Sequence, residues 1–123
     1  MSTPATGDRS TLFHLAVHDE WHAAAAGTTY VPAAFASEGF VHCSFAHQLR
    51  GVYGRYYAGR TDLVVLVFDR ATLVAAVGAD ALREEPSPST GELFPHVYAP
   101  LPRDAARAVL DLDQAWSAVD AAG

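Results

Sequence analysis

The sequence predicts a single domain of the α+β class. Its β-type apolar segments outnumber its helical ones, and they do not alternate with helices as in a βαβ fold. The 123 residues are enough for one hydrophobic core and too few for two ordinary domains. Half of them are hydrophobic and 18% are charged, which indicates a compact globule. We expect one domain over residues 11–113, between an N-terminal tail, 1–10, and a C-terminal tail, 114–123.

The charge and the cysteine count exclude several classes of function. The formal net charge is −6 and all eight basic residues are arginine, which argues against a nucleic-acid partner because phosphates repel such a surface. There is no apolar run near the ~20 residues of a membrane helix. Residues 1–10 lack the apolar core of a signal peptide, so we expect no membrane partner and a cytoplasmic location. The single Cys43 excludes an intrachain disulfide.

The N-terminal half is predicted to hold two strands and two helices. Residues 11–16 alternate as a strand, and 19–26 form a short helix that starts with acids and ends at Gly27. The run 40–43 is a second strand after a Ser-Glu-Gly turn. Residues 45–58 are the strongest helix, with apolar and tyrosine side chains at helical spacing, Ser44 as its N-cap and Gly59 as its stop.

The C-terminal half is predicted to be mainly β. Residues 62–68 are a continuous apolar run, which is typical of a central strand buried on both faces. A helical turn at 71–76 and a strand at 81–85 follow. Residues 93–98 form another strand, in which Pro95 indicates an edge or a bulge. The segment 105–112 fits either a helix or a strand.

Three histidines, His14, His42 and His96, are expected in the middle of strands. Histidine is a weak β-former and is costly to bury without a partner, so these placements need a reason. Each one alone is equally well explained as a core histidine with satisfied hydrogen bonds. Together they fit a cleft that binds ligand hydroxyls or phosphates, or a three-histidine metal site. We expect the ligand cleft, and no metal.

Other candidate residues give weaker signals. Cys43 cannot be activated by His42, because neighbours in a strand point to opposite faces, so Cys43 is expected in the core. His18 and His22 share a helix face, but the glutamate that follows the first histidine in the zincin motif is missing. Two further groups are candidates. The carboxylates near a strand end are Glu84, Glu85 and Glu92. The side chains of the predicted helix that either bind a nucleotide or simply pack are Arg50, Arg55, Arg60, Tyr53, Tyr56 and Tyr57.

Two sequence blocks, EGFVHCS at 38–44 and GELFPHVYAPL at 91–101, are specific to one family. With Phe13-His14, Trp21 and Tyr56-Tyr57, they resemble the small bacterial family called domain of unknown function 952, from about Leu12 to Leu112. The resemblance implies an ADP-ribosyltransferase-like fold, related to the RNA 2′-phosphotransferases. Such a fold is a split, mostly antiparallel sheet with two flanking helices, and the wider group binds NAD⁺ in its cleft.

The resemblance also implies roles for individual residues. His14 would contact the adenosine-side ribose or hold the nicotinamide end, and His42 would line the nicotinamide pocket. His96 and Tyr98 fall near the strand on which other branches carry a catalytic glutamate, and no glutamate occupies that strand here. The extra N-terminal domain of the RNA 2′-phosphotransferases is also expected to be missing.

We therefore expect a protein that binds NAD⁺ or a related nucleotide, with transferase activity of the ADP-ribosyl or phosphoryl type. The alternatives are a non-catalytic module that binds a small ligand or a protein, and a three-histidine metalloprotein. The expected catalytic residues are His14, His42 and His96. The expected ligand-binding residues are His14, His42, Ser44, Arg50, Tyr57 and Tyr98.

Overall fold

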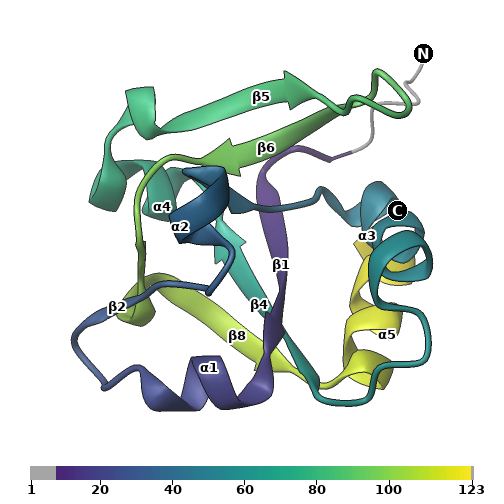
Figure 1. The fold of residues 1–123 in the computed structure, drawn as a ribbon, viewed down its shortest axis with the longest axis horizontal. Helices are drawn as coiled ribbons and strands as arrows, with labels where there is room; N and C mark the ends of the chain where they lie inside the picture. The colour runs from purple at the N-terminus through teal and green to yellow at the C-terminus, as the bar shows by residue number, and fades with distance from the viewer. Residues whose placement is uncertain (1–7, 123) are drawn as a thin grey trace.

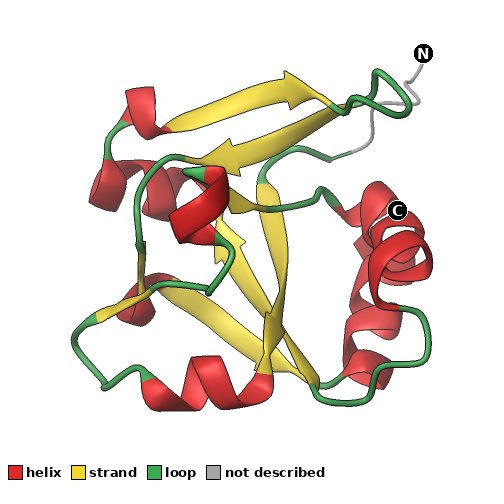
Figure 2. Cartoon of the chain, in the orientation of Figure 1, coloured by secondary structure: helices red, strands yellow, loops and turns green. Residues whose placement is uncertain are grey.

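The computed structural model describes residues 8–122 and has the predicted α+β architecture (Figures 1 and 2). Most of the predicted N-terminal tail, 1–10, lies outside the described residues. The strands form two three-stranded antiparallel sheets and one short antiparallel pair. In chain order they are β1 (Thr11–Val17), β2 (Thr29–Tyr30), β3 (Val41–His42), β4 (Leu63–Asp69), β5 (Leu82–Pro86), β6 (Leu93–Val97), β7 (Leu101–Pro102) and β8 (Ala106–Leu110).

The first sheet has the order β1-β4-β8, so β4 is the central strand, as predicted. Its apolar run is buried on both faces, which is why the sequence does not alternate. Val65 and Val67 pack on one side with α3 (Ala46–Val52) and α5 (Leu112–Ala122). Leu66 and Phe68 pack on the other side with Leu12 and Trp21. The sheet thus separates two apolar clusters and provides the rigid base of the molecule.

The second sheet has the order β3-β6-β5, and it corrects the expectation that Pro95 marks an edge or a bulge. Strand β6 is central, and Pro95 lies opposite Glu84 of β5. The Pro95 carbonyl accepts a hydrogen bond of 3.0 Å from the Cys43 N–H, so the side of β6 that lacks a donor faces β3. Strand β3 ends at His42. Proline is tolerated at this position because the N–H that it lacks would point just beyond the end of β3.

Ser44 joins the two sheets rather than capping a helix. Two backbone hydrogen bonds of 2.8 Å connect it to Phe13 of β1, just after the chain leaves β3. The prediction that Ser44 is the N-cap of the following helix is therefore wrong. Instead Gln48 accepts a hydrogen bond of 3.0 Å from the Phe45 N–H and donates one of 2.7 Å to the Leu93 carbonyl. This buried amide fastens the start of α3 to β6.

Within the described part of the chain, five α-helices surround the sheets, where the resemblance implied two. The strongest predicted helix, 45–58, is α3 followed by a π-helical turn, Tyr53–Tyr57. The predicted helical turn at 71–76 is a full helix, α4. The remaining bounds are α1 (His18–Ala23), α2 (Phe35–Glu38) and α4 (Arg70–Val77). No helix among residues 8–122 combines the length and the apolar character that crossing a bilayer requires.

The predicted C-terminal tail, 114–123, is wrong for residues 114–122, because these residues belong to helix α5. Ala115 and Val119 of α5 are buried in the same apolar cluster as Leu49 of α3. The helix begins with a reciprocal pair of hydrogen bonds, in which Asp111 and Gln114 side chains each accept from the other's backbone N–H. The ambiguous segment before it is a strand, β8, paired with β4.

Candidate functional site

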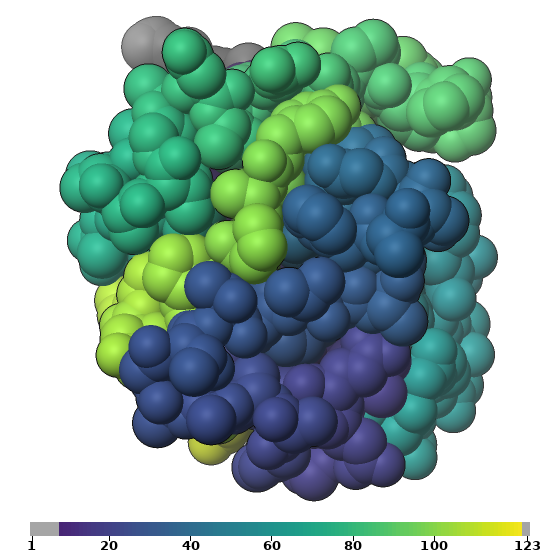
Figure 3. Space-filling model, turned by 60° about the vertical axis from the view of Figure 1, so that its left-hand side comes forward, coloured from purple at the N-terminus to yellow at the C-terminus, as the bar shows by residue number. Residues whose placement is uncertain are grey.

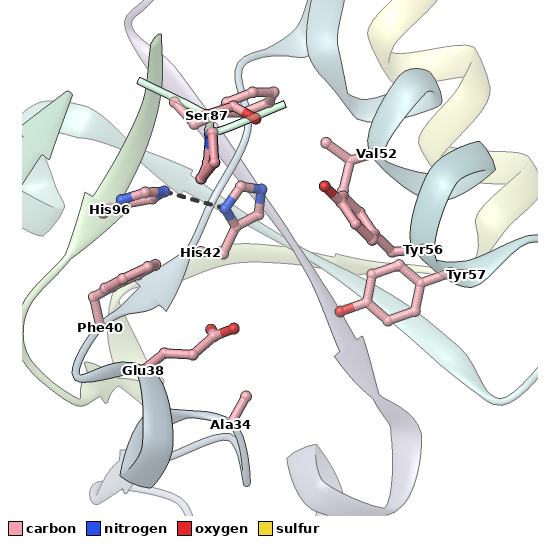
Figure 4. Close-up of a pocket in the computed structure, with 11 residues that line it drawn as sticks. Ala34, Glu38, Phe40, His42, Val52, Tyr56, Tyr57, Ser87 and His96 are labelled. Atoms are coloured by element: carbon pink, nitrogen blue, oxygen red, sulfur yellow. Dashed lines mark hydrogen bonds between the residues drawn. The ribbon is translucent and has the colours of Figure 1, made fainter. Parts of the chain in front are cut away.

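A cavity of about 470 Å³ lies between α2, the β3–β6 pair and the π-helical turn after α3 (Figure 4). Its volume is in the range of small-molecule sites, roughly 300–1,000 Å³. In Figure 3 the segment between α1 and α3 (blue) lies on the surface of the molecule, beside the chain that follows β6. The lining residues are Ala34, Glu38, Phe40, His42, Val52, Tyr56, Tyr57, Ser87, Pro88, Phe94 and His96.

The short β3–β6 pair places two of the predicted histidines side by side. His42 lies directly opposite His96 in the register, so both rings point to the same face. Phe40 reaches this face after Gly39, whose φ of +82° ends α2 with a turn that favours glycine. The Phe40 ring stacks on the His96 ring with centroids 4.0 Å apart. The cavity wall is thus built of aromatic faces, which suit a planar ligand ring.

His42 has one satisfied and one unsatisfied ring nitrogen. Its Nδ1 is 3.2 Å from His96 Nε2, the contact drawn in Figure 4. Its Nε2 is buried and has no hydrogen-bond partner among the described residues. Burial, followed by the proximity of the titratable His96 and His14 and of Arg55, lowers the pKa of His42 to about 4. The ring is therefore neutral at pH 7, and it leaves a polar atom unpaired at a cost of roughly 1–3 kcal/mol.

Glu85 stands behind His96. Its Oε1 accepts hydrogen bonds from His96 Nδ1, at 2.8 Å, and from the Tyr98 hydroxyl, at 2.5 Å. The Tyr98 hydrogen bond, followed by that of His96, lowers the pKa of the Glu85 carboxyl, and the carboxylate in turn raises the pKa of Tyr98. Glu85 faces Phe94 across the β5–β6 pair, so its side chain reaches the neighbouring His96 on the same face.

His14 is a satisfied core histidine. Its Nδ1 donates to the His42 carbonyl at 2.8 Å, and its Nε2 accepts from the Tyr30 hydroxyl at 3.2 Å. Burial lowers its pKa to about 4, against the opposite effect of the His42 carbonyl. His14 lines a second cavity of about 220 Å³, which shares His42, Glu38 and several other walls with the first. His42 is thus the histidine common to both cavities.

The other predicted site residues divide into two groups. Tyr57 lines both cavities, as its expected role in ligand binding requires. The expectation that Arg50 meets a ligand phosphate in the cleft is wrong, because Arg50 pairs with Asp120 of α5 at 3.0 Å and lies over Trp116. Ser44 is buried at the junction of the two sheets and lines neither cavity.

Tyr98 and Cys43 also lie outside the cavity walls. Tyr98 donates a hydrogen bond to Glu85 and does not line either cavity. Cys43 is fully buried, and burial raises the pKa of its thiol to about 12. The expectation that Cys43 is a core residue is confirmed.

The three histidines do not converge on a common point. His14 directs its nitrogens at a backbone carbonyl and a tyrosine, while His42 and His96 face each other. Among residues 8–122 there is no group of three or more His, Cys, Asp or Glu side chains placed to hold a metal ion.

Two cavity features went unnoticed in the sequence. Phe40 was expected on the same strand face as His42, but it was not named as a residue of the ligand site. Glu38 lines both cavities from the end of α2, a four-residue helix that the sequence did not predict. Glu85 was a candidate, but only its pairing with β6 reveals its contact with His96.

Comparison with known proteins gives a family and two similar structures. The model of the family described as "Protein of unknown function (DUF952)" matches residues 15–109. The crystal structure of protein CC0527 from Caulobacter crescentus is 26% identical with a TM-score of 0.71, covering 82% of this chain and 84% of that one. The solution NMR structure of CC0527 is 28% identical with a TM-score of 0.69, covering 84% of each chain. No curated protein matches the chain.

Proposed function

The chain belongs to the DUF952 family, and from its cleft we propose that it binds a nucleotide, NAD⁺ or a close relative, against His42. The observation that carries this proposal is the buried and unpartnered Nε2 of His42 on the wall of an aromatic cavity. Buried polar groups are almost always satisfied, so an unsatisfied one in a native fold calls for an explanation such as a functional role or a bound partner. A ligand donor at this nitrogen would recover the free energy that the free protein loses there.

The chemistry of the walls supports a nucleotide. Phe40, Tyr57 and Phe94 offer faces for a planar base or pyridine ring. The carboxylate of Glu38, which lines both cavities, suits ribose hydroxyls, because it only accepts hydrogen bonds. Arg55 lies near enough to His42 to affect its pKa and could meet a phosphate. The adjoining second cavity gives room for the other half of a dinucleotide.

We extend the proposal to the fold and the reaction. Two antiparallel sheets joined by the bridge between Phe13 and Ser44 are compatible with the split sheet of the ADP-ribosyltransferase-like fold. Transfer at the nicotinamide ribose would then depend on orientation and electrostatics, with the Glu85 carboxylate behind His96 in place of the glutamate that other branches carry near the position of His96.

A second candidate is ligand binding without turnover. It is favoured by the position of Glu85, which lies behind His96 and does not line either cavity. A carboxylate held there cannot contact the ribosyl centre directly. Release of nicotinamide from bound NAD⁺, followed by chromatography, separates the two candidates, because a binding module would release none.

Calorimetric titration with NAD⁺ at pH 7.5 tests the proposal. We expect binding by the native protein and at least tenfold weaker binding by His42→Phe, which keeps a ring and removes both nitrogens. The matched control is His22→Ala, because His22 is exposed on α1 and lines neither cavity. Absence of binding at millimolar NAD⁺, or equal affinity of the native protein and His42→Phe, would refute it.

A further inference from the structure

We infer that Glu85, supported by Tyr98, fixes the tautomers of His96 and His42 so that His42 presents an unprotonated Nε2 to the cleft. The cleft then selects a ligand that offers an N–H or O–H group at that point. The selection of the ligand rests on the proposed function, whereas the assignment of the tautomers does not. Glu85 and Tyr98 are positioning residues that act through His96.

The first step follows from what a carboxylate can do. An ionised carboxylate only accepts hydrogen bonds, so the 2.8 Å contact with Glu85 requires the proton to be on His96 Nδ1. The Tyr98 hydroxyl donates to the same oxygen and thereby favours the ionised form. These two hydrogen bonds hold the pKa of the Glu85 carboxyl below its usual range. His96 is therefore held with Nδ1 as its donor.

The second step is that the tautomer of His96 fixes the tautomer of His42. In its neutral form the His96 ring has one N–H, which Glu85 holds on Nδ1, so Nε2 is left as an acceptor. The 3.2 Å contact with His42 Nδ1 is then a hydrogen bond only if His42 donates it. This uses the single N–H of a neutral His42, whose pKa of about 4 keeps it uncharged at pH 7. Its Nε2 consequently carries a lone pair and no proton.

The third step concerns the ligand. A lone pair at His42 Nε2 repels carbonyl and phosphate oxygens and attracts amide N–H or hydroxyl groups. Figure 4 shows this edge of the ring directed away from His96, toward the side of the cavity that Val52 and Tyr56 line. Because the atom is buried, a neighbouring side chain must move before a ligand can reach it. Tyr56, with 62% of its surface exposed, has the most freedom to do so among the lining aromatic residues.

Long-range ¹H–¹⁵N spectra of histidine-labelled protein at pH 7.5 test the tautomers without any ligand. In the native protein we expect His96 and His42 both to be protonated at Nδ1 and bare at Nε2. In Glu85→Ala we expect the Nε2–H form to appear on both rings, because nothing then holds the proton on His96 Nδ1. Glu92→Ala, which removes another carboxylate near this sheet, should leave both tautomers unchanged. A native His42 protonated at Nε2 would overturn the inference even if no variant folds.

The ligand is tested with NAD⁺ and the same spectra. On binding, the His42 Nε2 resonance should move toward the protonated value, and Glu85→Ala should bind NAD⁺ roughly tenfold more weakly, with Glu92→Ala unchanged. Binding of NAD⁺ that leaves the Nε2 resonance in place would overturn the selection of a donor while leaving the proposed function intact. Failure of NAD⁺ to bind would refute the proposed function, and the native tautomers would still decide the assignment.

Discussion

The buried neutral His14 should make the protein lose stability in mild acid. Burial lowers the folded-state pKa of His14 from 6.5 to about 4. Below pH 6.5 the unfolded chain therefore binds a proton that the folded chain refuses, and stability falls as the pH falls. The loss levels off below the folded-state pKa, where both states are protonated.

The size of the effect follows from the two pKa values. At pH 5 the unfolded histidine is almost fully protonated, whereas about a tenth of the folded His14 is protonated. The free energy of unfolding should therefore be about 2 kcal/mol lower at pH 5 than at pH 7 on account of His14 alone. His42, whose pKa is also lowered to about 4, adds its own slope over the same interval, so the test must compare variants.

Urea denaturation at pH 7, 6 and 5 measures this slope in the native protein and in His14→Asn. The asparagine amide can still donate to the His42 carbonyl and does not titrate. We expect the variant to be less stable at pH 7 and to lose about 2 kcal/mol less on going to pH 5. His22→Ala is the control, because His22 is exposed and should leave the slope unchanged. Equal slopes in all three proteins, or an NMR titration of His14 near pH 6.5, would refute the reasoning.

Two further predictions concern stability. Gln48→Ala should lower the free energy of unfolding by about 2–3 kcal/mol, because it removes the acceptor for the Phe45 N–H and leaves the Leu93 carbonyl without its buried donor. Gln114→Ala, at the exposed start of α5, should cost about 1 kcal/mol or less, and equal losses in urea denaturation would show that burial does not decide the difference. Removal of residues 112–123 should abolish cooperative thermal unfolding, because it uncovers the apolar cluster beneath α3, and a sharp transition followed by circular dichroism would contradict this.

The hydrophobic pattern of the sequence predicted those elements that are buried regularly along their whole length. The run 62–68 is apolar throughout because β4 is central and covered on both faces, and the sequence alone conveys this. Pro95 misled the prediction because the sequence cannot show that β3 ends at His42, which pairs with His96, so that the position opposite Pro95 lies just beyond the strand. Helix α5 was missed for a similar reason. Alanine at 115 and valine at 119 are a weak apolar stripe until the surface of α3 is there to receive them.

For the site, the sequence supplied the histidines but not their partners. His14, His42 and His96 were singled out because histidine is unusual in the middle of a strand. Their hydrogen bonds depend on the register between strands that are distant in the chain, so the sequence could not separate a satisfied histidine from a free one. The direction of the Arg50 side chain could not be predicted for the same reason, because its ion pair with α5 determines that direction.

His14 and His42 differ in how completely their ring nitrogens are hydrogen-bonded, and this difference makes the proposed function of the cleft testable. Burial lowers the pKa of both rings to about 4, so pKa alone does not distinguish them. His14 has a partner for each nitrogen, and its free energy of burial is recovered within the fold. His42 has a partner only for Nδ1, and its Nε2 remains unpaired on the wall of the cavity. Hydrogen bonds within the fold therefore offset the free-energy cost of burying His14 but only part of the cost of burying His42. A ligand donor at His42 Nε2 would offset the remainder.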